Sequence, residues 1–69
     1  MATVTVYNRW DYDNTLTGAR TALGRGDYST AFCNFKACLE YIKDYEPWND
    51  SEISMLESAI SNVETMLKY

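Results

Sequence analysis

The sequence predicts a mainly α protein, a small three-helix bundle made of a helical hairpin and a third amphipathic helix, preceded by an N-terminal extended or β arm. Apolar side chains recur at helical spacing in three stretches, which glycines and a proline separate. The chain has 69 residues, so we expect a single domain over residues 1–69. Its 46% hydrophobic content exceeds that of disordered chains and predicts a folded core.

Residues 1–9 form the predicted arm, because their apolar and polar side chains alternate with the period of a half-buried β-strand. The apolar set is Ala2, Val4 and Val6, and the other set is Thr3, Thr5 and Tyr7. No other stretch has this period, and a lone strand leaves its backbone groups unpaired. Three interpretations stay open: a frayed arm, a segment draped over the helices, or a pairing with another chain, as in a homodimer through residues 2–7.

The first helix is predicted over residues 13–24, with Asp13 or Asn14 as its cap. Its apolar positions are Leu16, Ala19 and Leu23. A Gly-Arg-Gly turn follows at 24–26, and we expect one of its glycines to take the left-handed conformation that ends many helices. A strip of small residues, against which another helix can pack closely, is formed by Gly18 and Ala22.

The second helix is predicted over residues 28–45. Its apolar stripe consists of Ala31, Phe35, Cys38, Ile42 and Tyr45, widened by Phe32 and Leu39. So wide an apolar face indicates a central helix that contacts neighbours on two sides. Pro47 cannot continue the helix, and a loop from Glu46 therefore leads to the next element.

The third helix, over residues 50–68, has the clearest pattern. Asn49 or Asp50 is the predicted cap, and Glu52 gives the start the form of a capping box. The apolar stripe consists of Ile53, Leu56, Ile60, Val63 and Leu67, with Ala59 and Met66 beside it. This stripe is either the core of the bundle or the seam of a homodimer through the third helix.

Catalytic, cofactor and metal sites have no support in the sequence. The chain has no histidine, no serine or cysteine beside a recognisable base, and no glycine-rich phosphate loop. Cys33 and Cys38 lie on one predicted helix, about 140° apart around its axis, so they cannot pair with each other. We expect both to be reduced core residues. The sequence thus predicts no enzyme, no cofactor and no bound metal.

Membrane and nucleic-acid contacts are also disfavoured. No stretch approaches the roughly 18 apolar residues of a membrane span, and the first residues do not have the pattern of a secretory signal. Lysines and arginines form no cluster of the kind that binds phosphates. We therefore expect a cytoplasmic chain whose partner is a protein.

Charge and aromatic residues are concentrated in particular stretches. Residues 1–26 carry a net charge of +1 and residues 27–69 a net charge of −5. Within 7–13 and 41–50, tyrosines and tryptophans, which dominate many interfaces, alternate with carboxylates, which steer association with basic surfaces. The predicted partner-binding residues are Trp10, Asp11, Tyr12, Asp13, Asp44, Tyr45, Glu46, Trp48 and Asp50. Alternatively, Trp10 and Trp48 are peripheral core residues that close the bundle at its loop ends.

One motif within the hairpin consists of Gly26, Asp27, Tyr28, Ala31, Phe35, Leu39 and Glu40. It resembles the second half of a tetratricopeptide repeat, in which a Gly-Asp-Tyr turn leads into a helix. Ala19 stands where that family has a small residue in the first helix of the repeat. The resemblance implies an antiparallel helical hairpin.

The order of arm, helix, glycine turn and helix resembles that of ribbon-helix-helix repressors. This resemblance implies a small DNA-binding dimer whose strands pair between subunits and enter the major groove. The positions that would read bases are Thr3, Thr5 and Tyr7, or Arg9.

The profile of one small acidic domain without catalytic residues is similar to that of phage-encoded inhibitors, such as anti-CRISPR and other anti-defence proteins. Such proteins block a host protein by covering one of its surfaces. The similarity implies a non-enzymatic inhibitor or modulator whose acidic and aromatic residues cover a basic surface on a nucleic-acid-processing or defence protein. The alternatives are the DNA-binding dimer and an adaptor subunit of a larger complex.

Overall fold

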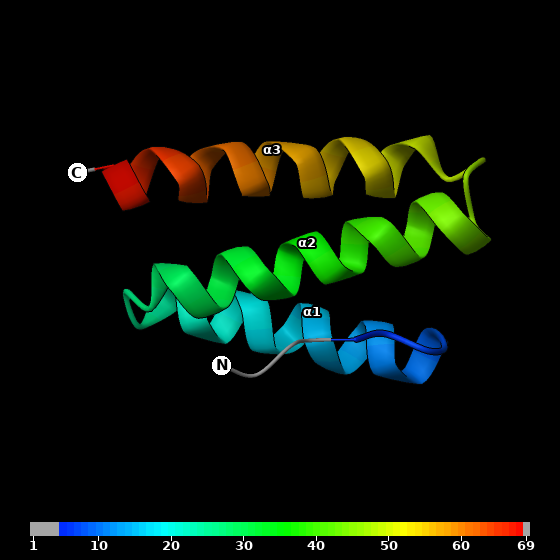
Figure 1. Ribbon diagram of the computed structural model, residues 1–69, viewed down its shortest axis with the longest axis horizontal. Coiled ribbons are helices and arrows are strands. Elements are labelled where there is room, and N and C mark those ends of the chain that lie inside the picture. Colours follow the sequence, from blue (N-terminus) through cyan, green and yellow to red (C-terminus); the bar gives the residue numbers. More distant parts are fainter. Residues whose placement is uncertain (1–4, 69) are drawn as a thin grey trace.

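The computed structural model describes residues 5–68, which form a small, mainly α three-helix bundle (Figure 1). The helices are α1 (Arg9–Gly24), α2 (Tyr28–Tyr45) and α3 (Asp50–Lys68). The predicted fold class is therefore confirmed, and the bounds of α2 and α3 coincide with the predicted ones. No strand occurs within residues 5–68. The predicted arm and the proposed pairing through residues 2–7 lie partly outside the described residues.

α2 lies between the other two helices (Figure 1). Both α1 and α3 pack along α2, whereas α1 and α3 contact each other much less. Short connections make each successive pair antiparallel, which is the hairpin arrangement that the sequence predicted. The wide apolar face of α2 follows from this position, because a central helix must bury side chains toward both neighbours.

The core lies along α2 and is filled by side chains of all three helices. Its buried members are Tyr12, Ala19, Ala22, Ala31, Phe35, Cys38, Ile42, Leu56, Ile60 and Val63. The stripe of α3 thus faces α2 through its central residues rather than forming an outward seam. Three residues predicted to lie in apolar stripes, Leu23, Tyr45 and Leu67, are exposed instead, and so is Met66. Each of these four is close to a helix end, where the neighbouring helix no longer covers it.

The first helix begins at Arg9, four residues before the predicted start, and the prediction of Asp13 or Asn14 as its cap is wrong. Asn8 is the cap, because its side-chain oxygen accepts a hydrogen bond from the backbone N–H of Asp11 at 2.9 Å. In return, the carboxylate of Asp11 accepts from the backbone N–H of Tyr7 at 3.2 Å. The bond to Asn8 satisfies a backbone donor that a helix start leaves free, and the bond to Tyr7 ties the preceding segment to the first turn.

The turn between α1 and α2 uses one glycine in the predicted way. Gly26 has a φ of 78°, the left-handed conformation that other residues rarely adopt. Asp27 then caps α2 by accepting from the N–H of Thr30 at 3.3 Å. Close packing at the small-residue strip is also confirmed, since a Cβ on Gly18 would lie 3.1 Å from Nδ2 of Asn34 on α2.

Residues 5–7 lie draped over the helices, which is one of the three interpretations of the arm. Val6 is partly buried and packs against the core, while Tyr7 points to solvent. The segment lies beside Ala37 and Tyr41 of α2, and together they line a shallow recess.

The two cysteines have different surroundings. Cys38 is buried, as predicted, and its thiol donates a long hydrogen bond of 3.8 Å to the carbonyl oxygen of Tyr12. Burial raises the pKa of the Cys38 thiol to about 11, and the carboxylates of Glu52 and Asp13 add to the shift. Cys33 is exposed, so its prediction as a core residue is wrong. Because Cys33 lies five positions before Cys38 on the helix, it points away from the face that α2 buries.

Candidate protein-binding surface

The two aromatic and acidic stretches, far apart in the sequence, meet at one end of the bundle (Figure 1). This end comprises the start of α1, the end of α2, the loop to α3 and the start of α3. Direct contacts join the stretches: Arg9 pairs with Glu46, and the Tyr12 hydroxyl bonds to Glu52. We call residues 7–13 and 41–52 the acidic end.

The net charge of the molecule resides at the acidic end. Its residues include two basic and six acidic side chains, whereas the remainder of the chain has four of each. The whole net charge of −4 therefore belongs to this end. The division predicted along the sequence, +1 against −5, becomes a division in space between a charged end and a charge-balanced remainder.

Four aromatic rings of the acidic end face solvent. Trp10 is 73% exposed and Trp48 is 74% exposed, with Tyr45 at 61% and Tyr7 at 76%. The alternative in which the two tryptophans close the core is therefore wrong. Large rings that remain in water cost free energy that a partner can recover by covering them. Trp10, Tyr45 and Trp48 thus have the exposure that a binding role requires.

Tyr12 does not have that exposure, and its prediction as a contact residue is wrong. It is 1% exposed, and its hydroxyl donates to the carboxylate of Glu52 at 2.5 Å. Burial raises the pKa of Tyr12 well above its ordinary value, and the hydrogen bond to Glu52 raises it further. Its ring centroid lies 5.7 Å from that of Tyr41, which in turn lies 5.1 Å from that of Tyr45. Tyr12 therefore supports the surface from beneath.

Arg9 lies within the acidic end and pairs with two of its carboxylates. Its Nη1 donates to both carboxylate oxygens of Glu46 at 3.3 Å, and its Nε lies 3.6 Å from Asp13. The guanidinium also lies 4.5 Å from the centroid of the Tyr12 ring. Desolvation acts to lower the pKa of Arg9, but Glu46 and Asp13 outweigh it and raise that pKa. Two of the predicted charge partners, Glu46 and Asp13, are thus already paired.

The remaining predicted carboxylates divide into two groups. Asp11 bonds to the backbone of Tyr7, so it stabilises the start of α1. Asp44 and Asp50 are exposed, and within residues 5–68 their carboxylates form no hydrogen bond or ion pair. These two acids, with Trp10, Tyr45 and Trp48, are the part of the predicted site that is free to contact a partner.

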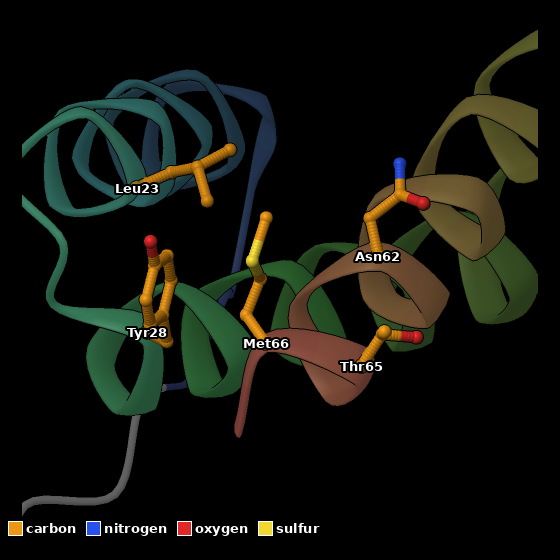
Figure 2. A pocket seen from close by; sticks show the side chains of 5 residues that line it. All are labelled: Leu23, Tyr28, Asn62, Thr65 and Met66. Carbon is orange, nitrogen blue, oxygen red and sulfur yellow. The ribbon is translucent and has the colours of Figure 1, made fainter. Parts of the chain in front are cut away.

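The opposite end of the bundle has a groove that sequence reasoning missed. Figure 2 shows Leu23 of α1, Tyr28 of α2 and Met66 of α3 converging on one space, with Asn62 and Thr65 at its side. The groove has a volume of about 460 Å³. It lies where α1 ends and α2 begins, beside the last turns of α3.

Two absences hold for residues 5–68. No group of three or more histidine, cysteine, aspartate or glutamate side chains is placed to hold a metal ion. No helix in this range combines the length and apolar composition needed to span a membrane. In comparisons with known proteins, no family, no curated sequence and no solved structure matches the chain.

Proposed function

We propose that this chain is a non-enzymatic binding protein that covers a basic surface of a nucleic-acid-processing or defence protein and thereby inhibits or modulates it. The observation that supports the proposal is the exposure of Trp10 and Trp48 at the end that holds the whole net charge. A small acidic inhibitor of the anti-CRISPR or wider anti-defence kind, encoded by a phage and acting in the host cytoplasm, fits this surface.

Rings and carboxylates have separate tasks in such a complex. Buried aromatic side chains supply most of the affinity in typical interfaces, and a few of them dominate. Carboxylates steer the approach of a basic partner and set its orientation, which raises the association rate. At the acidic end, Trp10, Tyr45 and Trp48 fit the first task and Asp44 and Asp50 the second.

The first experiment uses alanine variants and affinity capture. The full chain captures its partner from lysate, and the affinity for the purified partner is then measured for Trp10→Ala and Trp48→Ala. We expect each to weaken binding by about 30-fold, the effect of losing an interface hot spot. Met66→Ala, at the opposite end, is the matched control and should leave affinity unchanged. Equal affinity of all variants would refute the surface assignment.

The second experiment tests the charge. Asp44→Lys together with Asp50→Lys should slow association and weaken binding. The control is Glu57→Lys together with Glu64→Lys, which changes the net charge equally on exposed positions of α3 outside the acidic end and should weaken binding less. Raising the ionic strength should weaken wild-type binding, because salt screens exposed charges. An affinity that does not change with salt would contradict the proposal.

A further inference from the structure

The contacts of Arg9 reveal which kind of basic group suits the acidic end. One nitrogen of its guanidinium, Nη1, donates to both carboxylate oxygens of Glu46, and the guanidinium carbon lies over the ring of Tyr12. Half of the side chain remains exposed, so these contacts form at the surface rather than in the core. A carboxylate beside an aromatic face is thus an arrangement that this surface already uses to hold an arginine.

We infer that the exposed rings of the acidic end select a partner segment rich in arginine over one rich in lysine. This inference rests on the proposed function and names the chemistry of the partner. Trp10, Tyr45 and Trp48 are exposed to solvent. Asp44 directly precedes Tyr45, and Asp50 lies two residues after Trp48, both with free carboxylates. Tyr45 and Trp48 thus each have a free carboxylate within two positions of sequence, and a ring and a carboxylate are the two kinds of group that Arg9 contacts.

The preference for arginine over lysine follows from physical differences between the two side chains. A guanidinium is planar and weakly hydrated, so it stacks on an aromatic face and still bonds to a carboxylate in its own plane. A lysine ammonium is a compact charge that holds its water strongly and gains less from a ring. Charge complementarity alone would treat the two alike, so the difference measures the contribution of the rings.

The test uses two synthetic peptides of equal length and charge, in which six arginines or six lysines alternate with glycine and serine. Binding to the full chain is measured at low salt by calorimetry. We expect the arginine peptide to bind about tenfold more tightly, from roughly two stacking contacts. Trp10→Leu and Trp48→Leu, which keep apolar side chains at these exposed positions, should reduce that ratio to about twofold. Met66→Leu is the control and should preserve the ratio.

The other outcomes overturn the inference. Equal affinity for the two peptides would refute arginine selectivity and leave the proposal of a basic partner standing. A ratio that survives both tryptophan substitutions would show that the rings do not carry it. Binding of neither peptide would also refute the inference, and the capture experiment with the native partner would then decide the proposed function separately.

Discussion

The hydroxyl of Tyr12 connects α1 to α3, two helices that otherwise share few contacts. Its bond to Glu52 spans 40 positions of sequence and joins the two helices at the acidic end. Arg9 closes the same region by reaching from α1 to Glu46 in the loop after α2. Single side chains therefore fix how the three helices are arranged where the candidate surface lies.

Replacing Tyr12 with phenylalanine tests this link. The change keeps the buried ring and removes only the hydroxyl, so Glu52 loses its partner. We expect the free energy of unfolding, measured by chemical denaturation, to fall by about 1–2 kcal/mol. Tyr7→Phe removes an exposed hydroxyl and should change stability by less than about 0.5 kcal/mol. Equal effects of the two substitutions would contradict the role assigned to the Tyr12 hydroxyl.

Alkaline pH provides a second test at the residue scale. Cys38 and Tyr12 ionise near pH 9.0 and 10.0 in an unfolded chain, whereas the fold raises both pKa values. Their contribution to stability is therefore complete below about pH 9 and decreases as pH rises, for Cys38 through about 11. Denaturation between pH 8 and 11 should show this loss. Cys38→Ala should reduce the dependence of stability on pH, and Cys33→Ala should not. The reverse result would refute the contribution assigned to the buried Cys38 thiol.

At the scale of elements, the sequence marks some helix boundaries more clearly than others. The stripes of α2 and α3 extend over nearly their full lengths, and Pro47 and Gly26 mark their limits, so both could be predicted from the sequence. The start of α1 could not, because its first turn contains mostly polar and aromatic residues. The signal was Asn8 followed by Asp11, an acceptor at the cap and an acid three residues later.

This boundary also decided which aromatic residue is buried. Trp10 and Tyr12 have similar neighbours in the sequence, and composition does not distinguish them. In a helix that begins at Arg9, the two side chains point about 200° apart. Tyr12 then shares a face with Ala19, which lies in the core, and Trp10 points away. With the start placed at residue 13, no such orientation could be derived.

Substitutions at two asparagines distinguish the two possible starts of α1. Asn8→Ala removes the observed cap and should lower the free energy of unfolding by about 1 kcal/mol. Asn14→Ala removes a residue that lies inside the helix, where alanine is the better helix former, so stability should stay equal or rise slightly. Chemical denaturation measures both. A larger loss for Asn14→Ala would place the start where the sequence first indicated it.

At the scale of the whole molecule, the bundle has two unlike ends. One end holds the net charge and the exposed tryptophans, and the other has the groove on which Leu23, Tyr28 and Met66 converge. The sequence could predict that rings and carboxylates cluster, because each stretch is local. It could not predict that Arg9 pairs with Glu46, since that contact depends on how α1 and the loop after α2 meet.

The most direct test of the acidic end as the binding surface maps the residues of the folded chain that contact the partner. The full chain is labelled with ¹⁵N and titrated with the partner recovered by affinity capture, while amide chemical shifts are followed by NMR. We predict that the shifts concentrate in residues 7–13 and 41–52, with the indole N–H signals of Trp10 and Trp48 among the most affected. Shifts concentrated around Leu23, Tyr28 and Met66 would contradict the assignment of the acidic end as the binding surface.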